Sequence, residues 1–153
     1  MSNSNLILLT PSRRGRFMES KIKTAEKPGT VVQIDVSEGL SVNGWPAQWE
    51  VYAPGTDGHY PGLMGILLPA LSGSLATEAY VAGDECQVYI PVNGDEFKLI
   101  VGDASSAFGD IMIPDSGTGK LVADAGTPHF KPFQMLKATT GADELGHCIF
   151  CGS

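Results

Sequence analysis

The stretch CQVYIPVNGDEFKLIV, residues 86–101, decides the fold class of this chain. Alternate residues of its first half lie on one face: Cys86, Val88, Ile90 and Val92. An extended pattern resumes at residues 96–101, and Asn93-Gly94 stands between the two runs, where both residues tolerate a positive φ. Pro91 cannot donate a hydrogen bond to a neighbouring strand, so one side of the first run is expected at a sheet edge or a bulge. The stretch therefore predicts a β-hairpin.

Short extended runs and turn residues continue on both sides of this stretch. Nineteen glycines and ten prolines are spread evenly along the chain, which is typical of many short strands joined by turns. Further strands are expected at residues 30–36, 48–52, 111–113, 121–122, 133–139 and 145–151. A short helix is compatible only with residues 70–79. The pattern favours the all-β class, as a sandwich or a compact irregular β-barrel with at most one or two short helices.

Basic side chains crowd the beginning of the chain. Residues 1–30 hold six of the ten: Arg13, Arg14, Arg16, Lys21, Lys23 and Lys27. This segment carries about +4 and the remainder about −11, which gives the formal net charge of −7. With Pro28-Gly29 as the boundary, we expect an extended basic N-terminal arm at residues 1–28 and a single β domain at residues 29–153. Such an arm suits a tether to acidic surfaces, and a frayed, solvated terminus is the alternative.

The charge and hydropathy patterns restrict the expected partners. An acidic body argues against nucleic acid as the main partner, because binding phosphate needs a cationic face. No apolar stretch is long enough for a membrane span, since residues 63–71 are few and are broken by Gly65 and Pro69. The apolar run at residues 6–9 precedes its arginines instead of following them, unlike a secretory signal. We therefore expect a protein that is made in the cytoplasm and has no membrane partner.

Motifs for catalysis or cofactor binding are weak. The stretch DSGTGK, residues 115–120, lacks the first glycine of a phosphate-binding loop and the Ser or Thr after its lysine, so it is interpreted as a turn. Glycine precedes four aspartates whose spacing does not fit calcium loops and favours turn chemistry: Asp84, Asp95, Asp103 and Asp110. His59 and His129 have no nucleophile signature nearby. We therefore expect neither an enzyme nor a cofactor.

The three cysteines exclude a fully paired disulfide framework. Cys148 and Cys151 form a Cys-x-x-Cys pair, and Cys86 with His147 could complete a set of four zinc ligands. A structural zinc site requires a second closely spaced pair of ligands, which the sequence lacks. A redox-active pair of cysteines is expected at the start of a helix. Ordinary packed or exposed thiols are the favoured interpretation, and metal, redox and inter-subunit roles stay open.

The order of turn motifs along the chain resembles a known family. YVAGDECQVYI at residues 80–90, GDIMIPD at residues 109–115 and GKLV at residues 119–122 are similar to the auxiliary capsid proteins of tailed bacteriophages, also called decoration, cement or head-stabilising proteins. The resemblance spans roughly residues 27–151. It implies a non-enzymatic virion protein that binds the outer surface of a phage capsid and stabilises contacts between capsomers. It also implies a β-tulip-like homotrimer or a jelly-roll-like dimer, of which we favour the trimer.

A mode of attachment follows from this resemblance. Extended apolar residues of the arm would pair with an exposed strand of the major capsid protein: Leu6, Ile7, Leu8 and Leu9. Three arginines would meet capsid carboxylates: Arg13, Arg14 and Arg16. A set of large side chains would lie at subunit interfaces, with core packing as the alternative for at least half of them: Trp45, Trp49, Tyr52, Tyr60 and Met64. The arm and these side chains are the candidate binding residues.

A different class of protein also fits the sequence. A β domain that displays the loop at residues 54–62 would recognise carbohydrate or a host-cell receptor. Tyr52, His59 and Tyr60 place ring side chains in or beside that polar loop, which suits a glycan as well as a protein interface. Binding to glycans or to host cells separates this alternative from capsid attachment.

Overall fold

The computed structural model describes residues 7–10, 16–52, 64–69, 78–124 and 132–152. The regular secondary structure of these residues consists of strands alone, which confirms the all-β class. The strands are β1 (Leu8–Thr10), β2 (Arg16–Ile22), β3 (Val31–Ile34), β4 (Gln48–Val51), β5 (Met64–Leu68), β6 (Glu85–Ile90), β7 (Glu96–Val101), β8 (Ile111–Pro114), β9 (Leu121–Ala123), β10 (Phe133–Met135) and β11 (Glu144–Phe150). The helix considered at residues 70–79 lies mostly outside the described residues.

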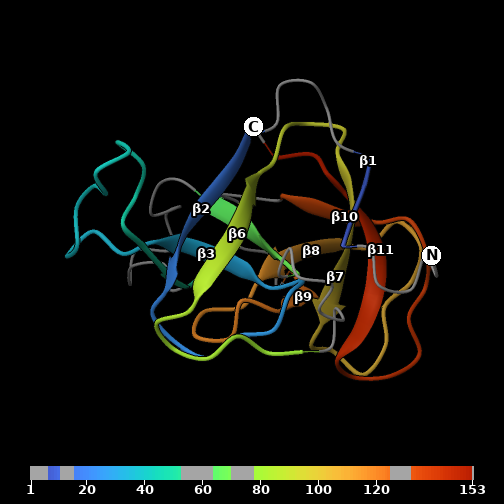
Figure 1. Cartoon of the computed structure of the whole chain (residues 1–153). Helices are drawn as coiled ribbons and strands as arrows, with labels where there is room; N and C mark the ends of the chain where they lie inside the picture. The colour runs from blue at the N-terminus through green and yellow to red at the C-terminus, as the bar shows by residue number, and fades with distance from the viewer. Residues whose placement is uncertain (1–6, 11–15, 53–63, 70–77, 125–131, 153) are drawn as a thin grey trace.

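These strands build two small barrels of five strands each, to which β1 is added (Figure 1). The first barrel closes in the order β2-β4-β3-β5-β6. The second barrel follows the order β7-β11-β10-β8-β9 and closes where β9 returns to β7, with Leu121 opposite Val101. β1 pairs with the opposite end of β7. The first described strand, β1, therefore lies on the second barrel, the strands β2 to β6 build the first barrel, and β7 to β11 complete the second.

The molecule has two apolar clusters, one inside the first barrel and one, which we call the shared core, to which both barrels contribute. Leu67 of β5 belongs to the interior cluster of the first barrel, whereas Ile66 and Leu68 pack in one cluster with the interior of the second barrel. A strand that is buried on both faces needs a continuous apolar run, which β5 provides. Gly65 is required within this run, because a side-chain carbon there would clash with Val88 of β6. The outer wall of the first barrel is therefore part of the core of the second.

The strands expected in residues 86–101 exist as β6 and β7, but the predicted hairpin between them is wrong. β6 pairs with β2 and β5 of the first barrel, and β7 pairs with β1 and β11 of the second. A two-residue hairpin of the Asn-Gly type needs a positive φ at both turn residues, whereas in this turn only Gly94 has one, at 95°. Gly94 N donates to Phe150 O, and the Asp95 carboxylate accepts from the Tyr89 hydroxyl. The turn therefore carries the chain from one barrel to the other.

The described residues of the segment 1–28 lie largely in the sheets instead of forming a separate arm. β2 pairs with β6 from Arg16 to Lys21 and closes the first barrel against β4. Met18 and Ile22 belong to the interior of that barrel and are almost fully buried. The sequence analysis did not predict this strand, because polar and charged residues surround its two buried apolar side chains. Residue 28 therefore marks no boundary between an arm and a domain in the described part of the chain.

Candidate functional site

β1 is an edge strand in the sheet of the second barrel. Leu8 lies opposite Phe97 of β7, and Ile7 O accepts a hydrogen bond of 2.7 Å from Lys98 N. Ile7 is 1% exposed and belongs to the shared core, and Leu8 packs against that core. On its side away from β7, β1 has no strand partner within the described part of the chain. The apolar segment thus uses one of its edges inside its own fold.

The residues expected to attach to a capsid are only partly described. The structure includes Ile7, Leu8, Leu9 and Arg16. Those outside the described residues are Leu6, Arg13 and Arg14. Arg16 is exposed at the start of β2, and the ring of its neighbour Phe17 packs against that of Tyr89 in a tilted arrangement with the centroids 4.9 Å apart. Figure 1 shows that β1 ends and β2 begins at the same end of the molecule, so their described residues lie close to one surface.

Most of the side chains expected at a subunit interface are buried inside the chain. Trp49 has no exposed surface in the first barrel, and Tyr52 and Met64 belong to the shared core. Trp45 is half-buried against the core of the first barrel. Tyr60 lies outside the described residues, as does the rest of the loop at residues 54–62 that the alternative function requires. Core packing, the alternative considered for these side chains, therefore accounts for the three buried ones.

A surface that the sequence did not single out lies between β3 and β4. Residues 36–47 form a loop that projects from the first barrel, which we call the projecting loop (Figure 1). Its exposed large apolar side chains are Val36, Leu40 and Val42. Ser41 N donates to Trp45 O at 2.7 Å, and Ala47 N donates to Gly39 O at 3.0 Å. The loop is therefore an internally hydrogen-bonded structure that presents aliphatic groups to its surroundings.

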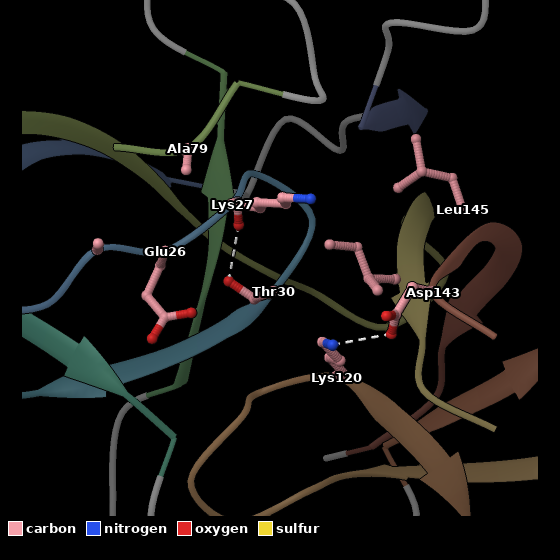
Figure 2. Close-up of a pocket in the computed structure, with 9 residues that line it drawn as sticks. Glu26, Lys27, Thr30, Ala79, Lys120, Asp143 and Leu145 are labelled. Atoms are coloured by element: carbon pink, nitrogen blue, oxygen red, sulfur yellow. Dashed lines mark hydrogen bonds and ion pairs between the residues drawn. The ribbon is translucent and has the colours of Figure 1, made fainter. Parts of the chain in front are cut away.

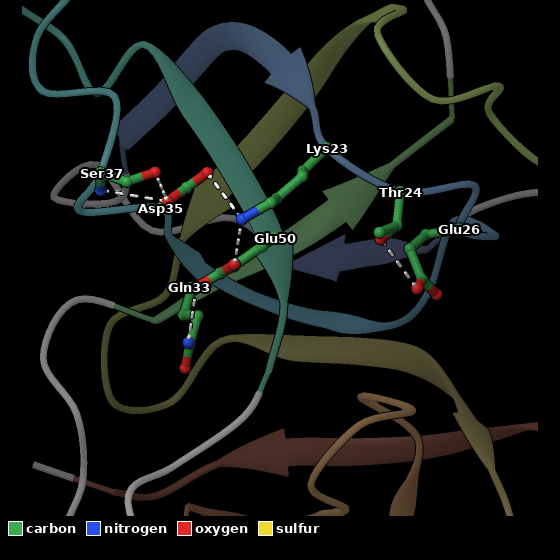
Figure 3. A network of polar contacts seen from close by, with 7 residues as sticks. All are labelled: Lys23, Thr24, Glu26, Gln33, Asp35, Ser37 and Glu50. Carbon is green, nitrogen blue, oxygen red and sulfur yellow. Dashed lines mark hydrogen bonds and ion pairs between the residues drawn. The ribbon is translucent and has the colours of Figure 1, made fainter.

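A charged network anchors the base of the projecting loop (Figure 3). Lys23 Nζ lies 3.1 Å from Asp35 Oδ2 and 3.2 Å from Glu50 Oε2. Ser37 donates to Asp35 through its hydroxyl and its backbone N–H. The hydrogen bond from the Ser37 hydroxyl is the main cause that lowers the pKa of Asp35, and the bond to Asp35 is the main cause that raises the pKa of Lys23. The network thus ties the loop to the end of β2 and to β4.

A pocket of about 330 Å³ lies where the two barrels meet (Figure 2), and we call it the inter-barrel pocket. Its apolar lining comes from Ala25, Ala79, Ile100 and Leu145. Its polar lining comes from Glu26, Lys27, Thr30, Lys120 and Asp143. Lys120 Nζ lies 2.8 Å from Asp143 Oδ1, and burial raises the pKa of the half-buried Glu26. The pocket lining thus combines apolar side chains with charged side chains of both signs.

The set of zinc ligands considered from the sequence is not brought together. Cys86 is buried in the first barrel and Cys148 in the second, and burial raises the pKa of both thiols, that of Cys86 to about 12. His147 Nε2 lies 2.8 Å from Glu96 Oε1 instead of approaching a thiol. Across the described ranges, no group of three or more His, Cys, Asp or Glu side chains is arranged to hold a metal ion.

Two further expectations concern a turn and the helices. The stretch at residues 115–120 is a turn, as the sequence indicated, with Gly119 N donating to Asp115 O and Asp115 N to Lys120 O. The described residues contain no helix with the length and apolar character that crossing a bilayer would need.

Comparisons with known proteins place the fold. No family model matches the sequence, and no curated protein matches it. Among solved structures, the fold is similar to that of the N base of the head fiber gp8.5 in bacteriophage phi29, with a TM-score of 0.52. The match covers 89% of this chain and 93% of that chain at 10% sequence identity. Similarity at this level of identity shows a shared fold.

Proposed function

We propose that this protein is a structural component of a bacteriophage virion that attaches to the outer surface of the head. The observation that carries the proposal is the fold shared with the base of a phage head fiber over nearly the whole of both chains. The order of turn motifs, which resembles that of phage head decoration proteins, is a separate argument for the same role. On this proposal the protein acts by binding and not by catalysis.

The proposed partner is the major capsid protein, and the proposed effect is to stabilise contacts between neighbouring capsomers. An edge strand presents backbone N–H and C=O groups, so a capsid segment would add to the side of β1 that faces away from β7. Arg13, Arg14 and Arg16 would contact capsid carboxylates and make attachment sensitive to salt. Many such contacts, repeated over a closed shell, would act together.

Self-association as a homotrimer belongs to the same proposal. With Trp49, Tyr52 and Met64 buried, the exposed aliphatic side chains of the projecting loop are better placed for a contact between subunits. Such a contact would remove apolar surface from water. Sedimentation equilibrium of the purified protein measures the mass, and a monomer at the concentrations of the binding assay would contradict the trimer.

Co-sedimentation with phage heads that lack this protein tests the attachment. The wild-type chain is expected to bind saturably at low salt. Arg16→Glu is expected to weaken binding about tenfold or more, because it reverses a charge beside the proposed contact. Lys137→Glu makes the same change of charge at an exposed residue between β10 and β11 and is the matched control. It is expected to bind like the wild type.

Two outcomes would count against this account. Failure of the wild-type chain to bind any head would overturn the proposal and direct the work to glycans and host receptors. An equal loss in Arg16→Glu and Lys137→Glu would overturn the local role of Arg16. Point variants are preferred to removal of residues 1–20, because that deletion takes away β1 and most of β2.

A further inference from the structure

The inter-barrel pocket is formed by segments that are far apart in the sequence. The connection from β2 to β3 supplies Glu26, Lys27 and Thr30, while β7 and β11 supply Ile100 and Leu145. In β7 the neighbours of Ile100 belong to the core cluster of the second barrel, and Ile100 lines the pocket while remaining 6% exposed. The volume of about 330 Å³ lies at the low end for ligand sites, which span roughly 300–1,000 Å³. The occupant is therefore a small group.

The cations of the pocket are available to a ligand. Lys27 has no hydrogen-bond or ion-pair partner for its ammonium group in the described part of the chain, and Figure 2 shows this group pointing toward the Leu145 side of the pocket. Lys120 is paired with Asp143, whose side chain is 60% exposed, and such surface pairs are weak and exchange readily. One unpaired and one exchangeable ammonium group thus line the pocket together with apolar side chains, in a chain whose net charge is −7.

The charges also exclude other ligands. A phosphate group carries more negative charge, which the half-buried Glu26 would repel, and the two cations are lysines instead of the arginines that bind phosphate in a bidentate manner. An amine would be attracted by Glu26 but repelled by Lys27 and Lys120. When the exposed Asp143 carboxylate is displaced toward solvent, the two ammonium groups of Lys27 and Lys120 and the one carboxylate of Glu26 leave a net charge of +1, which a single ligand carboxylate neutralises. The alanine, isoleucine and leucine side chains of the lining suit an aliphatic group attached to that carboxylate.

We propose that the inter-barrel pocket binds a carboxylate attached to a short aliphatic group, as in the C-terminal leucine of a polypeptide or a free branched fatty acid. The carboxylate lies between Lys27 and Lys120, and the aliphatic group packs on Ile100 and Leu145. The site is distinct from the open edge of β1 and stands whether or not the protein attaches to a phage head.

Titration of the full chain, followed by amide NMR shifts, tests this site. The probes are acetyl-Ala-Leu with a free carboxylate, the same peptide with a C-terminal amide, and 4-methylpentanoate. The free-carboxylate peptide is expected to give saturable shifts centred on pocket residues, with the amide at least about tenfold weaker. Tighter binding of the peptide than of 4-methylpentanoate assigns the site to a polypeptide C-terminus, and equal binding assigns it to a small acid. Equal binding of the peptide acid and its amide, or no saturable shift with either acid, overturns the proposal.

Three variants and one control locate the site. Lys27→Ala is expected to weaken binding about tenfold, because it removes the unpaired cation. Glu26→Gln is expected to tighten it several-fold, because it removes the repelling carboxylate, and Ala25→Phe is expected to block it by filling the pocket. Lys21→Ala removes an exposed lysine of β2 that does not line the pocket. Equal affinities of the Lys21→Ala and Lys27→Ala variants would overturn the assignment.

Discussion

Three aspartates, each preceded by a glycine, make the same turn at the start of a strand. The carboxylates of Asp84, Asp95 and Asp110 accept a hydrogen bond from the backbone N–H three residues earlier, at 2.9, 2.9 and 2.8 Å. The glycines before them have φ angles of 89°, 95° and 88°. The sequence indicated turn chemistry at these pairs, and the structure confirms it. Asp103 differs, because its carboxylate accepts from Ala123 N, a distant partner that local spacing could not reveal.

The backbone conformation of these turns predicts how a methyl group added at the glycine changes the stability of the protein. Gly94→Ala is expected to destabilise the protein by about 1–2 kcal/mol, because a side chain is strained at a positive φ even though the space around Gly94 is open. Gly102→Ala is the matched control, since an added carbon there meets Lys120 Cβ at an ordinary 3.4 Å. It is expected to change stability by less than about 1 kcal/mol. Urea unfolding measures both, and equal losses would contradict this explanation.

At the scale of strands, local sequence patterns predicted where strands lie but not which strands pair with one another. The alternation at residues 30–36 and the short runs that became β8 and β9 gave strands near their observed positions. β5 escaped notice because burial on both faces removes the alternation, and β2 escaped because few of its residues are apolar. The inter-barrel pocket could not be predicted, since Glu26, Ile100 and Leu145 meet only when the barrels close. The projecting loop lies between the strands expected at residues 30–36 and 48–52, but the exposure of its aliphatic side chains depends on how the first barrel folds.

The two N-terminal strands predict the effect of truncation. Removal of residues 1–10 is expected to lower Tm by several degrees, because it takes Ile7 out of the shared core and uncovers an edge of β7. Removal of residues 1–22 is expected to abolish cooperative unfolding, because β2 closes the first barrel between β4 and β6. Circular dichroism during heating measures both. An unchanged Tm in the two truncations would show that this segment is a solvated arm after all.

On the scale of the whole molecule, the shared core connects two barrels that are separate in their strand pairing. Val31, Ile66 and Tyr89 belong to strands of the first barrel, yet they pack in one cluster with Phe97 and Leu99 of the second. The first barrel has an interior cluster of its own, but the core of the second barrel is incomplete without the outer face of the first. The length of 153 residues led us to expect a single β domain, and no sequence pattern indicated two barrels.

A shared core predicts that the two barrels unfold together. Leu67→Ala in the first barrel and Leu99→Ala in the second are each expected to cost about 2–5 kcal/mol and to shift one common transition. Differential scanning calorimetry should give equal calorimetric and van't Hoff enthalpies for the wild type. Two separate transitions, each moved by only one of the variants, would show that the barrels are independent.

The pairing of β1 with β7 gives the molecule the connectivity of an insertion. Thr10 lies opposite Glu96, so the chain leaves the second barrel and returns to it at neighbouring points. Seen from the second barrel, the whole first barrel is a cassette spliced between two adjacent strands, an arrangement in which chain termini lie close together. Excising the cassette would leave a path that a short linker could bridge. It would also remove one wall of the core of the second barrel. The connectivity of the chain would thus allow the cassette to be removed, whereas the packing of the core would not.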